Sequence, residues 1–188
     1  MSKNLLKKQK LNYSKNVLDI VQFGSSVLEE SNPNDIDIAI IFQKIPLKNQ
    51  LEESQKIKRQ LEKTTTLPIH IKSYDFYTLF DKGNFAKENI LFYGKSLISE
   101  KYFAEKFSLI PKLEFHYSLT KLKKKDKIRF NYLLTGKKEK YGLLRKYHGK
   151  LLKPGLIETL PEYEIVFVEA IKKITSDFKT KKVFESVK

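Results

Sequence analysis

Residues 23–41, FGSSVLEESNPNDIDIAII, decide the fold of the first half of the chain. The stretch opens at the end of one apolar run, 16–23 (NVLDIVQF), and closes inside a second, 36–42 (IDIAIIF). Short apolar runs that are rich in branched side chains and bounded by turn formers are typical of buried strands. The sequence between the runs is too short for a long helix, so we expect two buried strands joined by a tight connection.

Two aspartates, Asp35 and Asp37, stand at the start of the second predicted strand. Because side chains alternate across a strand, both point to the same face. Carboxylates held this close repel each other unless a cation or a proton lies between them, and hard oxygen ligands favour Mg²⁺ (or Mn²⁺) carried by a phosphorylated substrate. Gly24 lets the backbone approach a triphosphate, and Ser25 and Ser26 lie where hydroxyls and amides can donate hydrogen bonds to it. We therefore expect a phosphoryl-transfer site.

FGSS at 23–26 and DID at 35–37, with apolar strands on both sides, resemble the signature of the nucleotidyltransferase (polymerase β) superfamily. ENILFYGKSLI at 88–98 is similar to the helix and small strand that often close minimal members. The resemblance covers residues 15–100. It implies a mixed sheet flanked by helices, a metal site at the two aspartates, and transfer of a nucleoside monophosphate from an NTP to an acceptor with two divalent ions bridging the phosphates.

The sequence departs from this pattern at the third acidic position. Active members usually supply a third carboxylate from a neighbouring strand, which helps to bind one ion and activates the attacking hydroxyl. The matching strand here is 68–74, PIHIKSY, and it places His70 where the acid should stand. A neutral imidazole can act as base or ligand but binds Mg²⁺ poorly, so His70 is a candidate catalytic residue or, alternatively, a core or supporting side chain. Leu28 stands where minimal members often carry arginine.

The other patterns up to residue 105 favour helices packed on this sheet. We expect helices over 47–63 and 84–93, a strand over 69–74 and a helical turn over 75–80 that Asp75 caps. The stretch 99–112 is expected to be a bridge that Pro111 ends. The predicted class is α/β (α+β), with a nucleotidyltransferase-like domain over 1–105 and a small basic α+β module over 113–188.

The net charge of +15 is concentrated in the second part of the chain, where residues 121–153 carry 13 Lys and Arg against 2 acidic residues. Such a cluster is expected of a surface that binds a polyanion, because each neutralised phosphate releases condensed counterions. The alternative is a solvated lysine-rich face. The candidate nucleic-acid contacts are the cations of this segment: Lys123, Lys124, Lys125, Lys127, Arg129, Lys137, Lys138, Arg145 and Lys146.

A helix is predicted over 123–135, with Ile128, Tyr132 and Leu134 facing inward. The aromatic residues interleaved with the cations can stack on bases, as in single-strand binders, or belong to the core. A second helix is expected over 140–148. An extended segment, a helix over 162–175 and a last strand over 181–187 complete the module.

Cysteine is absent, which excludes disulfides and thiolate metal sites. No apolar run approaches the ~20 residues that span a bilayer, so we expect a soluble cytoplasmic protein without a membrane partner. Three functions stay open: transfer of a nucleotide to nucleic acid, a nucleic-acid-binding module that has lost turnover, and modification of a protein. The preferred NTP, the acceptor (RNA, DNA or protein) and the oligomeric state are not determined by the sequence.

Overall fold

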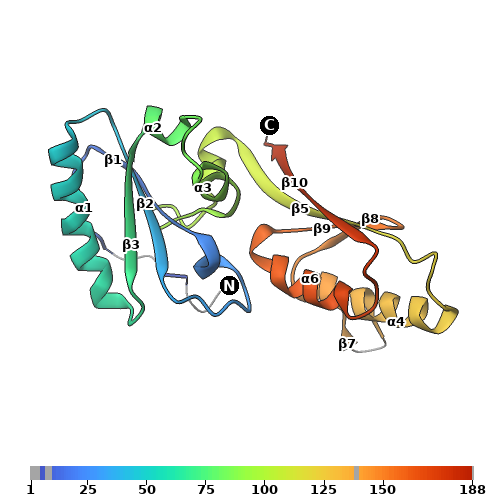
Figure 1. Cartoon of the computed structure of the whole chain (residues 1–188). Coiled ribbons are helices and arrows are strands. Elements are labelled where there is room, and N and C mark those ends of the chain that lie inside the picture. The colour runs from blue at the N-terminus through green and yellow to red at the C-terminus, as the bar shows by residue number, and fades with distance from the viewer. Residues whose placement is uncertain (1–4, 7–9, 138–139, 188) are drawn as a thin grey trace. The chain divides into compact units, whose positions relative to one another are not determined.

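The computed structural model describes residues 5–6, 10–137 and 140–187 (Figure 1). The chain forms two compact units. Unit 1 comprises Met1–Val27 and Ser31–Ser108, and unit 2 comprises Leu28–Glu30 and Leu109–Lys188. Both units combine helices with sheets, so the predicted mixture of α and β structure is confirmed at that level.

Unit 1 is built on a four-stranded sheet in the order β3-β2-β1-β4. The strands are Val17–Phe23 (β1), Ile36–Phe42 (β2), Ile69–Asp75 (β3) and Lys95–Ser96 (β4). β2 runs antiparallel to β1 and parallel to β3, and β4 pairs antiparallel with β1. The two strands expected around the Gly-Ser turn are therefore present as neighbours in a mixed sheet.

Helices cover both faces of this sheet (Figure 1). They are Leu47–Leu61 (α1), Phe76–Phe80 (α2) and Lys87–Tyr93 (α3), with 3₁₀ turns at Gly24–Val27, Glu62–Thr64 and Phe103–Phe107. The predicted cap is confirmed, because the Asp75 carboxylate accepts the Thr78 N–H at 2.7 Å. α3 begins at Lys87 rather than Asn84, since the Asn84 side chain accepts the Ala86 N–H and donates to the Leu79 carbonyl, which holds a turn.

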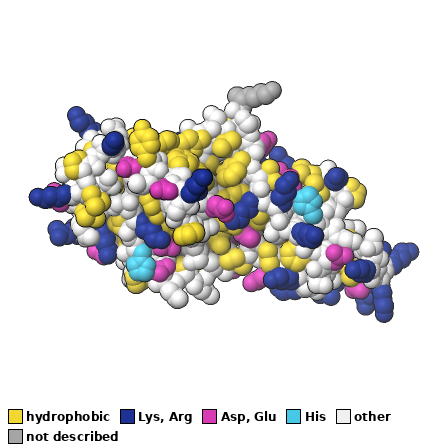
Figure 2. All heavy atoms as spheres, turned by 45° about the horizontal axis from the view of Figure 1, so that its top comes forward, with side chains coloured by type: hydrophobic (Ala, Val, Ile, Leu, Met, Phe, Trp, Pro, Cys, Tyr) yellow, Lys and Arg dark blue, Asp and Glu magenta, His cyan; other side chains and the backbone are white. Residues whose placement is uncertain are grey.

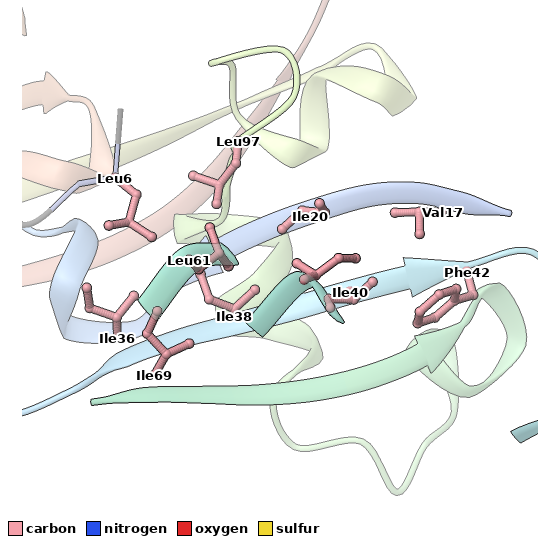
Figure 3. Close-up of a cluster of buried hydrophobic side chains, with 11 residues drawn as sticks. Leu6, Val17, Ile20, Ile36, Ile38, Ile40, Phe42, Leu61, Ile69 and Leu97 are labelled. Atoms are coloured by element: carbon pink, nitrogen blue, oxygen red, sulfur yellow. The ribbon is translucent and has the colours of Figure 1, made fainter. Parts of the chain in front are cut away.

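Alternate residues of β2 fill two separate cores. Ile36, Ile38 and Ile40 pack on α1 with Leu61 (Figure 3). The intervening residues face α2, α3 and the 3₁₀ turn at 103–107, and their core contains Val21, Ala39, Ile41, Leu79, Ile90 and Phe103. A strand buried on both sides reads as a continuous apolar run. Asp37 has the parity of the second set, so it lies at the end of the face that α2 and α3 cover.

Unit 2 is built on a four-stranded antiparallel sheet in the order β10-β5-β9-β8, with a separate ribbon β6-β7. The strands are Leu109–Tyr117 (β5), Gly136–Lys137 (β6), Lys140–Tyr141 (β7), Lys150–Lys153 (β8), Leu156–Thr159 (β9) and Phe178–Ser186 (β10). The helices are Lys124–Thr135 (α4), Leu143–Lys146 (α5) and Glu164–Lys172 (α6), the last preceded by a 3₁₀ turn at Pro161–Tyr163. The rings of Phe115, Phe130 and Phe167 are fully buried in its core.

Two sequence expectations for the second half are wrong in their bounds. The bridge expected to end at Pro111 does not, because β5 begins at Leu109 and continues through the proline. At Pro111 the strand is paired only with β10, since pairing with β9 starts at Leu113, and a strand paired on one side tolerates the missing N–H. The helix expected over 140–148 shrinks to α5 because Lys140 and Tyr141 pair with the preceding ribbon strand.

The inward face predicted for α4 is also largely wrong. Ile128 and Tyr132 are 43% and 46% exposed, whereas Phe130 and Leu134 are buried. Residues 130 and 134 are one helical turn apart, and the Phe130 ring packs on Tyr117 with centroids 4.8 Å apart. The bulky ring of Phe130 therefore defines the buried face, which leaves Tyr132 at the surface.

Candidate metal centre

Three side chains that can bind a cation converge where β1, β2 and β3 lie side by side. Asp35 immediately precedes β2, and Asp37 is paired with Phe23 of β1 and His70 of β3. Ligand atoms of Asp35, Asp37 and His70 all lie within 4.8 Å of one another. Within the part of the chain that the structure describes, this is the single group of three or more acidic or histidine side chains so arranged. The expected convergence of the two aspartates is thus observed, and the register brings His70 to them.

Gly24, in the turn after β1, lies against the Asp37 carboxylate. Its φ of +76° lies in the left-handed region, and a Cβ built there would stand 2.8 Å from Asp37 Oδ2. Any other residue would be strained in its backbone and would press on the carboxylate. The turn after β1 therefore needs glycine for two reasons, the left-handed backbone and the close approach of the Asp37 carboxylate.

The two serines of the turn have different environments. The buried Ser26 hydroxyl accepts from Gln22 Nε2 at 3.0 Å and donates to the Phe23 carbonyl at 3.2 Å, so it holds the turn. Ser25 is exposed, and its carbonyl accepts the Ser31 hydroxyl at 2.6 Å. Of the two candidate nucleotide contacts, Ser25 alone presents its side chain at the surface.

The electrostatics of the cluster favour a positive charge between the carboxylates. Burial raises the pKa of Asp37, the negative charge of Asp35 raises it further, and Lys72 and His70 oppose the shift. Asp35 Oδ2 lies 3.1 Å from His70 Nδ1. Because a raised pKa means that the ionised form of Asp37 is disfavoured, a proton or a metal cation relieves the repulsion.

β3 brings further residues to the same face that the sequence did not single out. Lys72 and Tyr74 follow His70 at the strand period of two, and they are paired with Ala39 and Ile41. Burial and the charge of Asp37 raise the pKa of the Tyr74 hydroxyl. The period-two spacing of residues 70, 72 and 74 was the available signal, but only the parallel register shows that they face Asp37.

No third Asp or Glu joins the group among the described residues. Asp75, the last residue of β3, caps α2. The donor set is therefore two carboxylates and one imidazole, which fits a divalent cation and is softer than three carboxylates. The site predicted for Mg²⁺ or Mn²⁺ exists as a group that can hold a metal ion, and the donor set does not single out Mg²⁺.

The chain matches no family model, no curated protein and no solved structure. In the described parts of the chain, no helix is both long and apolar enough to cross a membrane.

The candidate nucleic-acid contacts lie on three elements of unit 2 and next to one of them. Lys123 precedes α4, and Lys124, Lys125, Lys127 and Arg129 lie on it; Lys137 is in β6, and Arg145 and Lys146 end α5. All of these are exposed except Lys127, which is half-buried. Lysine and arginine side chains gather around the end of the unit that carries α4 (Figure 2). Lys138 lies outside the described residues.

Proposed function

We propose that the chain is a metal-dependent nucleotidyltransferase that moves a nucleoside monophosphate from an NTP to an acceptor, with nucleic acid held by the basic unit 2 as that acceptor. The observation that carries the proposal is the meeting of Asp35, Asp37 and His70 against the glycine of the turn after β1. Two carboxylates at the start of β2 that face the Gly-Ser turn after the neighbouring strand β1 suit a phosphate-bearing divalent ion. The superfamily fold suggested by FGSS and DID belongs to the same proposal.

The carboxylates of Asp35 and Asp37 would hold the ion, with His70 beside them. A divalent ion at this place supplies charge stabilisation for the triphosphate. The exposed Ser25 would donate its hydroxyl to phosphate oxygens, and the absence of a side chain at Gly24 lets the Asp37 carboxylate lie close to the turn. Lys72 adds a cation on the same face of the sheet.

The transfer forms a bond between the acceptor oxygen and the α-phosphorus of the NTP. The bond from the α-phosphorus to the oxygen that bridges to the β-phosphorus breaks, and pyrophosphate leaves with that oxygen. The acceptor hydroxyl loses its proton to a base. Asp35 engages Nδ1 of His70, which leaves Nε2 as the ring nitrogen that can take this proton.

The test is incubation of the purified chain with Mg²⁺ or Mn²⁺, labelled NTPs and a single-stranded oligonucleotide. Labelled oligonucleotide is the expected product, and Asp37→Asn is expected to lower its rate by about a hundredfold or more, because the amide cannot neutralise a cation. Glu52→Gln is the matched control, since Glu52 is an exposed carboxylate on α1. Absence of product with every NTP, or equal rates for Asp37→Asn and wild type, would contradict the proposal.

A second candidate is a nucleic-acid-binding module that keeps the fold without turnover. The observation that favours it is His70 at the strand position paired with Asp37, where a third acid is expected. His70→Asp separates the two functions. Activity created by this change supports the binding module, and activity abolished by it supports the enzyme.

A further inference from the structure

Unit 2 contains a pocket that the proposed chemistry does not use. It has a volume of about 450 Å³ and lies among α4, the β6-β7 ribbon, α5 and α6. Four cations and two tyrosines surround it: Arg129, Tyr132, Lys137, Tyr141, Lys146 and Lys173. None of the described residues that line it is acidic. The volume is in the range of small-ligand pockets.

The two tyrosines are placed as surface rings rather than core residues. Tyr132 is 46% exposed and Tyr141 is 66% exposed. A cation lies over each ring: Lys137 Nζ is 5.2 Å from the Tyr132 centroid, and the Arg145 guanidinium is 4.0 Å from the Tyr141 centroid. Tyr141 is exposed over most of its surface and Tyr132 over nearly half. A ring that holds a cation on one side and is this exposed can stack a flat base on the other.

The cations around the pocket are not equivalent. Lys146 hydrogen-bonds with Tyr147 and also feels the charges of Glu30 and Glu29, so part of its charge is already compensated. Arg129, Lys137 and Lys173 have no carboxylate partner among the described residues. Lys173 comes from the end of α6, far along the chain from the basic segment. The pocket is thus a convergence of separate elements.

We propose that this pocket takes one unpaired nucleotide of a single-stranded nucleic acid, with its base on Tyr141, the more exposed of the two rings, and its phosphate among Arg129, Lys137 and Lys173. A phosphate needs cations, and a base needs an exposed flat ring; the pocket offers both within one nucleotide-sized space. In a duplex the base faces are stacked and cannot reach such a ring. An acidic peptide would use the cations but leave the rings unused. The inference rests on the nucleic-acid part of the proposed function.

Binding is measured with the full chain and a labelled single strand of roughly a dozen nucleotides, by fluorescence anisotropy in EDTA. Tyr141→Ala is expected to weaken binding by about tenfold, because base–aromatic stacking is lost. Tyr141→Phe keeps the ring and is expected to bind as wild type does. Lys173→Ala is expected to weaken binding and to reduce its salt dependence, whereas Lys179→Ala, an exposed lysine on β10 of the same unit, leaves both nearly unchanged.

The proposal is overturned if Tyr141→Phe loses as much affinity as Tyr141→Ala, or if Lys179→Ala equals Lys173→Ala. Equal affinity for a duplex of the same length, or equal competition by polyglutamate or by free nucleoside monophosphate, would also overturn it. RNA and DNA strands are compared in parallel, and tighter binding of one of them identifies the kind of single strand that the pocket prefers. Because EDTA removes metal ions and no NTP is present, failure here is separate from failure of nucleotidyl transfer.

Discussion

The carboxylate cluster of unit 1 and the basic pocket of unit 2 are assembled in opposite ways. Asp37 lies between Ile36 and Ile38, which are 1% and 0% exposed and belong to the core against α1, and Ala39 and Ile41 of the same strand belong to the second core. Both faces of the strand are therefore held by cores. The cations and rings of the pocket come from separate elements and are mostly exposed. A site set by strand register therefore depends on the buried cores that hold the strand, whereas a site of exposed side chains is expected to lose affinity stepwise as single members are removed.

The largest effect on stability is expected from a change in the buried core that holds the strand of Asp37. Ile40→Ala removes a fully buried side chain from the core against α1 and is expected to lower the free energy of unfolding by about 2–5 kcal/mol. Leu151→Ala, at a 49% exposed position on β8, is expected to change it by less than about 0.5 kcal/mol. Urea denaturation of both variants measures the difference. Similar losses of unfolding free energy in the two variants would show that the buried core and the exposed surface contribute equally to stability.

Gly24→Ala tests whether the turn is fitted to Asp37. The left-handed φ costs about 1 kcal/mol for a residue with a Cβ, and that Cβ would stand 2.8 Å from the Asp37 carboxylate. We expect Mn²⁺ affinity, followed by electron paramagnetic resonance, to fall by about tenfold. Gly83→Ala is the control, since a Cβ there meets nothing nearer than 4.0 Å. Unchanged Mn²⁺ binding in Gly24→Ala would mean that the ion does not lie at Asp37.

The basic surface is expected to respond gradually. Replacing Lys123, Lys124 and Lys125 with alanine should lower the slope of log affinity against log salt by about two for a single strand, because each phosphate contact contributes about 0.7. The matched triple replacement of Lys179, Lys181 and Lys182, exposed on β10, should lower it less. Oligonucleotide binding at several salt concentrations gives the slopes. Equal slopes for the two triple variants would assign binding to net charge alone.

The smallest effect concerns Asp19, a second buried carboxylate of unit 1. Burial raises its pKa, against hydrogen bonds from Ser96 and the Ile20 N–H and the charge of Lys106. Because the folded-state pKa lies above the unfolded one, the stability that Asp19 contributes is complete below the unfolded pKa and is lost as pH rises through the folded pKa. Relative to Asp19→Asn, wild type should lose stability from acidic to neutral pH.

Urea unfolding of wild type and Asp19→Asn at a series of pH values measures this change. Asp37 titrates in the same direction, but it is present in both proteins and cancels from their difference. A stability difference that stays constant with pH would show that Ser96 and Lys106 fully compensate the burial of Asp19. In that case the two buried aspartates would differ in their effect on stability, because Asp19 faces a lysine whereas Asp37 faces a second carboxylate.

The convergence of Asp35 and Asp37 could be predicted from the sequence, whereas the Lys173 side of the basic pocket could not. Alternation across a strand is a local property of the backbone, so two aspartates two residues apart share a face wherever that strand packs. Lys173 joins Arg129 and Tyr132 only because α6 lies beside α4 in the folded unit. A contact between residues far apart in sequence leaves no local pattern.

By itself the sequence determined the buried strands around the Gly-Ser turn, the cap at Asp75 and the concentration of charge after residue 120. The tertiary structure was needed to bring Lys72 and Tyr74 to the face of Asp37 and to show that Phe130, not Tyr132, faces the core of unit 2. The physical reason is the range of the interactions. Turn chemistry, capping and side-chain alternation are settled within a few residues, but strand register and the choice of buried face depend on which distant elements pack together.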